Sequence, residues 1–178
     1  DNTVATPVLL NPIKHGANIV IHSLTKYIGG QGTSLGGAII DAGTFNWANG
    51  KFPEFTESSA GYHGLKYYET LGAASFTFKL ILEGLRDFGA ALSPTNAFNI
   101  IQGLETLPVR IKQHSKNALA LAQWLEQQEE VAWVNYPGLE SNQYKSLADK
   151  YLPNGQSGIV TFGPKGGFEA AKKIADIT

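Results

Sequence analysis

A lysine and two hydroxyl residues directly follow a short β-branched run. The run, Ile-Val-Ile at residues 19–21, has the composition of a buried strand. Ser23, Thr25 and Lys26 come immediately after it. At the end of a buried strand a lysine amine can be partly desolvated, which favours its neutral, nucleophilic form. The hydroxyls and the amides of the turn can hold a phosphate without adding charge.

An amine that can form a Schiff base beside a phosphate-binding turn is what pyridoxal phosphate (PLP) requires of a protein. The cofactor also needs an acid that keeps its pyridine nitrogen protonated, so that the ring accepts electrons. Asp1, at the end of what the pattern predicts to be a preceding strand, is the candidate. A lone lysine after a strand is also a common solvated surface residue, and hydroxyls are common in turns. The spacing by itself therefore leaves both interpretations open.

Short motifs along the whole chain narrow the choice, because they resemble one enzyme family, the Cys/Met-metabolism PLP-dependent enzymes. Within it the resemblance is strongest to the O-acetylhomoserine sulfhydrylase subfamily. The motifs are Asp-Asn-Thr at 1–3 with Thr-Pro at 6–7, Gly-Ala at 16–17, Ser-Leu-Thr-Lys-Tyr at 23–27, Gly-Thr-Phe-Asn-Trp at 43–47 with Gly-Lys-Phe-Pro at 50–53, Gly-Tyr-His-Gly-Leu at 61–65, Gln-Gly-Leu-Glu-Thr-Leu at 102–107, and Tyr-Pro-Gly-Leu at 136–139 with Lys-Tyr-Leu-Pro-Asn-Gly at 150–155.

The resemblance implies a role for each residue of the candidate site. Lys26 matches the catalytic lysine, which forms a Schiff base with PLP and moves protons between the α, β and γ carbons of the substrate. Asp1 matches the carboxylate that pairs with the pyridinium nitrogen, and Ser23 and Thr25 match hydroxyls that contact the phosphate. Thr3 is expected close to the ring, although a strand-end hydroxyl that satisfies the backbone is an equally open interpretation.

The resemblance also has gaps. Gln31 stands between two glycines where the sulfhydrylases usually carry histidine, a change that could tune selectivity. The family's upstream phosphate-binding turn, ring-stacking tyrosine and Tyr/Arg pair would lie before Asp1, and its substrate-carboxylate arginine after Thr178. Residues 168–178 have the pattern of an amphipathic helix that is still running at the last residue. We therefore expect the chain to be a fragment of a longer protein.

The activity that the resemblance implies is a PLP-dependent γ-replacement in methionine biosynthesis. O-acetyl-L-homoserine and sulfide, or a small thiol, would give L-homocysteine and acetate. Cystathionine γ-synthase, O-succinylhomoserine sulfhydrylase and γ-lyase activities are alternatives on the same scaffold. A non-catalytic structural fragment of a PLP-fold protein is an alternative of a different class.

The expected fold class is α/β. The resemblance implies the large domain of a PLP-dependent transferase of the aspartate-aminotransferase type (fold type I), built on a mainly parallel sheet. Residues 1–115 would be the C-terminal part of this PLP-binding domain, and residues 116–178 the first part of a smaller α+β domain.

Local patterns predict the elements. A helix should begin at the Ser93-Pro94 pair and run to about Leu104, with Phe98, Ile101 and Leu104 as its apolar stripe, and a second helix should open at Thr106 with Pro108 and run to Leu125. The other predicted elements are strands at 19–21, 36–41, 131–136 and 158–162, a glycine-rich turn at 29–37, a loop at 44–60, and helices at 76–88, near 146–150 and at 168–178.

Composition excludes several classes of function. The chain of 178 residues carries 14 Lys plus Arg against 15 Asp plus Glu, so it has no basic field for nucleic acid or an anionic membrane. It has no cysteine, which excludes disulfides and thiolate metal sites and fits a cytoplasmic location. No apolar run approaches the length of a membrane span. The resemblance implies small-molecule substrates as partners, together with further copies of the chain in a homotetramer whose active sites are shared between subunits.

Two further sequence features, a possible nucleophile elbow and the histidines, give weaker indications of function. Gly32-Thr33-Ser34-Leu35-Gly36 matches the nucleophile elbow of α/β-hydrolases, but a strand-like run follows it where that motif needs a helix. The histidines are scattered without ligand spacing, so no metal site is expected. His63 lies within a family motif, and a structural loop histidine is the favoured interpretation.

Overall fold

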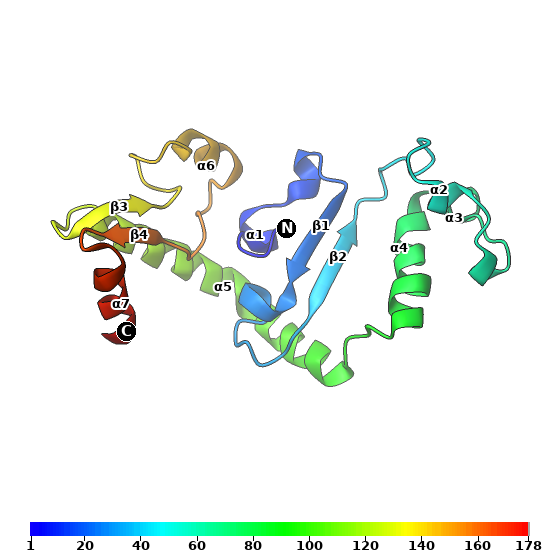
Figure 1. Cartoon of the computed structure of the whole chain (residues 1–178), viewed down its shortest axis with the longest axis horizontal. Coiled ribbons are helices and arrows are strands. Elements are labelled where there is room, and N and C mark those ends of the chain that lie inside the picture. The colour runs from blue at the N-terminus through cyan, green and yellow to red at the C-terminus, as the bar shows by residue number, and fades with distance from the viewer. Residues whose placement is uncertain (178) are drawn as a thin grey trace.

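The computed structural model describes residues 1–177, so Thr178 lies outside the described residues. Figure 1 shows an elongated chain in which one long helix connects two small sheets. The strands are β1 (Ile19–Ser23), β2 (Gly37–Asp41), β3 (Val131–Asn135) and β4 (Thr161–Pro164). The α-helices are α1 (Thr6–Leu9), α2 (Pro53–Thr56), α3 (Tyr67–Leu71), α4 (Ser75–Lys79), α5 (Pro94–Leu125), α6 (Lys145–Tyr151) and α7 (Gly167–Ile177). The 3₁₀ turns are η1 (Pro12–His15), η3 (Ala60–Tyr62) and η4 (Gly72–Ala74), and the π-helical segments are η2 (Leu24–Ile28) and η5 (Leu80–Asp87).

The first sheet confirms the two strands expected around the lysine. β1 and β2 pair antiparallel, with Ile21 opposite Ile39. Val20 and His22 of β1 are buried while Ile21 is exposed, which is the alternation of a strand with one covered face. The turn between the strands carries η2, so the geometry of the sheet decides where Lys26 lies.

The N-terminal residues run alongside β1 in the same direction. The Asn2 amide donates to the Ile21 carbonyl at 2.9 Å, and the Ser23 amide donates to the Thr3 hydroxyl at 2.7 Å. One bond joins the two backbones and the other ends on the Thr3 side chain, and from the first to the second the position advances along both segments. Among residues 1–177 all paired strands are antiparallel. The N-terminal segment is the neighbour of β1 that runs in the parallel direction expected for the sheet.

The region of residues 94–125 forms one helix, so the prediction of two helices is wrong. Ser93 caps the helix as expected, because its hydroxyl accepts from the Asn96 amide at 3.1 Å. Thr106 does not cap a second helix; its hydroxyl instead donates back to the Gly103 carbonyl at 3.2 Å. Pro108 lies inside the helix and removes one backbone donor. Packing along the whole helix outweighs that loss, since residues on one side are buried from Ile100 to Leu125.

The apolar stripe of α5 is also different from the predicted one. Phe98, Ile101 and Leu104 are exposed, whereas Ile100 and Leu107 are buried. These buried residues form a core with Leu9, Ile28 and Ile111. The apolar pattern of α5 has more than one possible face, and the packing of η2 against the helix selects among them.

Residues 44–88 form a separate aromatic core. Trp47, Phe55 and Tyr67 are its buried members. The predicted loop at 44–60 contains the short helix α2, and the helix predicted at 76–88 is present as α4 followed by the π-helical η5. The core therefore consists of rings from the loop packed on the rings of these helices.

The C-terminal part confirms the predicted strand, helix, strand and helix. β3 pairs antiparallel with β4, and Tyr136 is fully buried against α5 residues Ala118 and Ala122. The helix α5 crosses the predicted domain boundary at 115/116 without a break, and Leu152 packs against the core formed by Ile100 and Leu107. The division into domains stays a prediction.

Candidate active site

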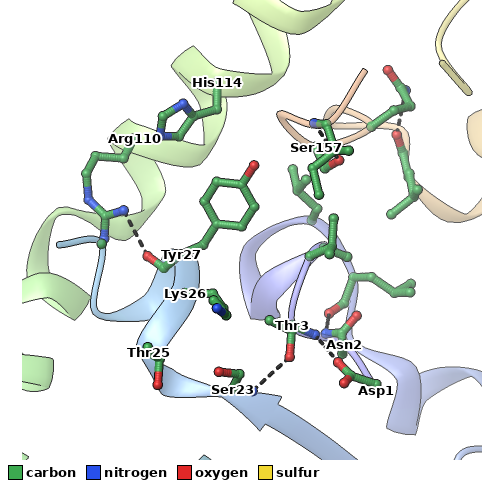
Figure 2. Close-up of a pocket in the computed structure, with 18 of the residues that line it drawn as sticks. Asp1, Asn2, Thr3, Ser23, Thr25, Lys26, Tyr27, Arg110, His114 and Ser157 are labelled. Atoms are coloured by element: carbon green, nitrogen blue, oxygen red, sulfur yellow. Dashed lines mark hydrogen bonds between the residues drawn. The ribbon is translucent and has the colours of Figure 1, made fainter. Parts of the chain in front are cut away.

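One open cavity of about 1160 Å³ brings together all the residues predicted for the site. Its walls come from the N-terminal segment, the turn after β1, the middle of α5 and the segment before β4 (Figure 2). The predicted residues among its lining are Asp1, Thr3, Ser23, Thr25 and Lys26. The structure therefore brings the predicted residues together around one cavity, although they come from segments that the sequence could not place together.

The N-terminal segment is fixed by Asn2. This buried side chain donates from Nδ2 to the carbonyls of Thr6 at 3.2 Å and Leu10 at 3.0 Å. Asp1 and Thr3 on either side of it can then face the cavity. The Asp1 carboxylate accepts from the Thr3 amide at 2.7 Å and is otherwise exposed.

The Thr3 hydroxyl forms a hydrogen bond with the backbone, which is one of the two interpretations considered for this residue. Its hydroxyl oxygen accepts from the Ser23 amide at 2.7 Å, which ties the N-terminal segment to the end of β1. The hydroxyl proton remains available to a ligand, because the bond uses only a lone pair. Thr3 can therefore both join the two segments and contact a group in the cavity.

Lys26 lies in a kinked π-helical turn. Its backbone (φ −85°, ψ −127°) departs from helical geometry inside η2, and its side chain projects into the cavity (Figure 2). The lysine is exposed. The residues of this chain therefore do not provide the partial desolvation expected from the strand end.

The two hydroxyls next to the lysine differ in their bonding. Thr25 Oγ1 accepts from the Gly36 amide at 3.1 Å and lies 3.4 Å from the Gly36 carbonyl, so it holds η2 to the start of β2. The Ser23 hydroxyl has no partner among residues 1–177. The Ser23 hydroxyl is thus free to donate a hydrogen bond to a ligand, while the Thr25 hydroxyl would have to turn its proton away from the Gly36 carbonyl to do so.

The cavity contains residues that the sequence did not single out. They include Tyr27, Arg110, His114 and Ser157, which Figure 2 shows around the lysine. The Tyr27 and His114 rings contact each other, with centroids 5.4 Å apart. Ser157 adopts φ 73°, a strained value for a residue with a side chain. No spacing rule joins α5 to a turn so far away in sequence, so only the adjacency of Tyr27 to Lys26 could have drawn attention to one of them.

The weaker sequence signals lie elsewhere. Ser34 is buried and its hydroxyl accepts from Asn99 Nδ2 at 3.2 Å, and β2 follows it, so the elbow motif lacks its helix. Gln31 is exposed, and the lysine cavity has Gly30 and Gly32 in its lining instead. His63, at φ 55°, lines a different cavity beside η3. Within residues 1–177 no cluster of side chains has the composition of a metal site.

The arrangement fits PLP. An amine, a carboxylate and hydroxyls line one cavity, and the Ser23 hydroxyl and the Thr3 proton are not engaged by the protein. These are the groups needed for an aldehyde, a ring nitrogen and a phosphate.

Comparison with known proteins agrees with this chemistry. The family model for Cys/Met metabolism PLP-dependent enzymes matches residues 1–178. The chain belongs to this family, whose cofactor is PLP. The resemblance seen in the motifs around Lys26 is thereby confirmed.

Individual relatives are more specific. The chain is 52% identical to the O-acetyl-L-homoserine sulfhydrylase of Leptospira meyeri, over 99% of this chain and 42% of that protein. It is 47% identical to the homocysteine synthase of Schizosaccharomyces pombe, over 94% of this chain and 40% of that protein. The chain thus spans about two-fifths of the length of these relatives.

A solved structure confirms the fold class. It is a crystal structure of a protein assigned as an O-acetylhomoserine (thiol)-lyase from Campylobacter jejuni, which contains N'-pyridoxyl-lysine-5'-monophosphate. It matches with a TM-score of 0.93 and 45% identity, over 99% of this chain and 44% of that chain. The chain therefore has the fold of part of a type I PLP-dependent enzyme.

Proposed function

We propose that this chain carries the cofactor lysine of a PLP-dependent γ-replacement enzyme. The reaction converts O-acetyl-L-homoserine and sulfide, or a small thiol, to L-homocysteine, or the corresponding thioether, and acetate. The observation that carries the proposal is the cavity in which Lys26 lies with Asp1, Thr3 and Ser23. The identity to proteins named as sulfhydrylases and homocysteine synthases supports the choice of substrates over the alternatives on the same scaffold.

Each residue of the cavity has a part in this proposal. PLP, when bound, withdraws electrons from the substrate carbons next to the amine. Lys26 Nζ binds the cofactor and then takes and returns protons at the substrate carbons. The Asp1 carboxylate holds a proton on the ring nitrogen. Ser23, with its unengaged hydroxyl, and Thr25 bind the phosphate together with the amides of the turn.

The organisation of the protein is part of the proposal. We infer that residues 1–115 belong to the PLP-binding domain and residues 116–178 to a smaller α+β domain, which the separate core around Tyr136 supports. We further propose a cytoplasmic homo-oligomer, expected to be a tetramer. Among residues 1–177 no helix has the length and apolar character needed to cross a membrane.

The test is to locate the cofactor. Borohydride reduction of the PLP-loaded protein, followed by peptide mapping, should place the pyridoxyl group on Lys26. Lys26→Ala should abolish the visible absorption band and the activity together, while Lys14→Ala, at an exposed lysine of η1, should change neither. A label on another residue would refute the assignment, and a protein that PLP never colours would support the non-catalytic alternative.

A second measurement separates the related activities. Initial rates with O-acetyl- and O-succinyl-homoserine, each with sulfide and with cysteine, should be highest for the acetyl ester with sulfide. A preference for the succinyl ester with cysteine would instead indicate a cystathionine γ-synthase.

A further inference from the structure

Arg110 of α5 binds the backbone of the turn that carries Lys26. Its Nη1 donates to the Tyr27 carbonyl at 2.8 Å, and its Nη2 donates to the Ile28 carbonyl at 3.3 Å (Figure 2 shows the first of these bonds). The same Nη2 donates to the Gly103 carbonyl at 2.8 Å. One side chain thus joins the two residues after Lys26 to the helix.

The turn needs such a donor. Tyr27 and Ile28 end η2, and the last carbonyls of a helical turn have no following amide to accept from. A guanidinium is planar and presents several donors in a fixed arrangement, so it can satisfy converging carbonyls that an ammonium would meet singly. Bonds from a charged donor are also stronger than neutral ones.

Arg110 is itself held in place. Its Nε donates to the Thr106 hydroxyl at 3.0 Å, one helical turn away. With the bonds to carbonyls, four of its five N–H groups are engaged by neutral groups of the protein. Little donor capacity is left for an anion, so the geometry favours a grip on the backbone over a ligand site.

Glycines bring the turn and the helix close enough for this grip. A Cβ at Gly103 would lie 2.0 Å from the Gly29 carbonyl oxygen, so no side chain fits between the helix and the turn. A Cβ at Gly30 would lie 2.7 Å from Arg110 Cζ, so the guanidinium occupies the space over that glycine. The contact between Gly103 and Gly29 sets the distance between the turn and α5, and the bonds from Arg110 set the orientation of the turn on the helix.

We propose that Arg110 is a positioning residue for Lys26: it fixes the turn of residues 24–30 on α5 and so directs the lysine amine toward the Asp1–Thr3 segment. The inference rests on the proposed role of Lys26 as the cofactor lysine. Arg110 acts through the turn and need not touch the cofactor. Its loss should therefore affect cofactor binding and the proton transfers of Lys26 more than the binding of substrate.

The experiment compares Arg110→Lys and Arg110→Ala with Lys112→Ala, which removes an exposed charge from the same helix. The readouts are the dissociation constant for PLP, the pH titration of the visible band without substrate, the separate values of kcat and KM, and the thermal melting temperature. For both Arg110 variants, the loss of these bonds should weaken PLP binding about tenfold or more and shift the pH titration of the band. kcat should fall more than KM rises, and added guanidinium should partly restore Arg110→Ala.

The outcomes separate this inference from the proposed function. If Lys26→Ala loses the band while Arg110→Lys keeps wild-type PLP affinity, titration and kcat, the positioning role is wrong and the proposed function stands. If Lys26→Ala keeps the band, the proposed function is wrong, and the positioning role that rests on it is wrong as well. Should the Arg110 variants not fold, Thr106→Val decides: removing the acceptor of Nε should weaken PLP binding about threefold. An unchanged affinity in that variant would overturn the positioning role.

Discussion

Two regions of this protein are held together by opposite means. Around Lys26 the backbone of a turn lies directly on α5, because Gly29, Gly30 and Gly103 leave no side chain between them. In residues 44–88 the elements are separated and joined by large rings, with Trp47 stacked on Phe76 at a centroid distance of 5.0 Å and an interplanar angle of 4°. The first region depends on glycines, which have no side chain at the contact, and the second depends on large aromatic rings that fill the space between its elements. The turn of residues 24–30 should therefore be disturbed by added atoms, and the aromatic core by removed atoms.

The largest effect is expected from emptying the aromatic core. Trp47→Ala removes a ring that packs on Phe45, Phe52, Phe55 and Phe76, and should lower the free energy of unfolding by about 4 kcal/mol. Trp47→Phe, which keeps an aromatic ring, should cost clearly less. Urea unfolding measures both. A loss equal in the two variants would show that ring packing does not hold this region together.

Adding one methyl group beside the turn of residues 24–30 should disturb the protein nearly as much. In Gly103→Ala the new Cβ must displace the Gly29 carbonyl, which should cost about 3 kcal/mol and weaken PLP binding. Gly84→Ala in η5 is the matched control, because its Cβ would meet nothing within 4 Å. If both substitutions are equally mild in urea unfolding and PLP titration, the contrast between the two regions is wrong.

A polar contact inside the aromatic region should have a smaller effect. Tyr67 is fully buried, and its hydroxyl donates to Glu83 Oε1 at 2.9 Å, while Lys79 Nζ lies 2.7 Å from the same oxygen. Burial, assisted by this bond and the negative charge of Glu83, raises the pKa of the Tyr67 phenol far above its usual range. Tyr67→Phe should destabilise the protein by about 1.5 kcal/mol.

The control for that substitution is Tyr68→Phe. The Tyr68 hydroxyl has no hydrogen-bond partner among residues 1–177, so its removal should be close to neutral. Chemical denaturation of both variants checks the prediction. A Tyr67→Phe protein as stable as Tyr68→Phe would mean that the bond to Glu83 contributes nothing.

The smallest effect is a pH dependence of stability that arises from His22, in the region around Lys26. His22 of β1 is buried and its Nδ1 has no partner among residues 1–177, and burial lowers its pKa below the usual 6.5. The unfolded state then binds a proton more readily than the folded state. Stability should therefore be complete above about pH 6.5 and fall as the pH drops toward the lowered folded value.

His22→Gln should flatten this decline in the free energy of unfolding between pH 7.5 and pH 5. His15→Gln, at an exposed histidine of η1, should leave the slope unchanged. An equal slope in the His22 variant and the wild-type protein would show that His22 titrates alike in the folded and unfolded states.

Local patterns predicted much of the secondary structure, and packing explains the main failures. β1, β2 and the start of α5 at Ser93 follow from short-range preferences and were predicted correctly. Thr106 and Pro108 also have the local pattern of a helix start, yet tertiary contacts continue α5 through them. The exposed Phe98 and Ile101 show the same limit, since apolar side chains do not reveal which helix face will be covered.

The sequence by itself determined the family, through motifs that are spread along the whole chain. Lys26, Asp1 and the hydroxyls of the turn could be named as candidates without coordinates, because their residue types fit the cofactor and the motifs around them resemble those of the family. Only the tertiary structure decided that Arg110 grips the lysine turn and that Gly103 lies against Gly29, because these pairs are far apart along the chain. Such contacts depend on how the helix packs against the turn, and a local pattern of residue types does not predict which distant residues will pack together.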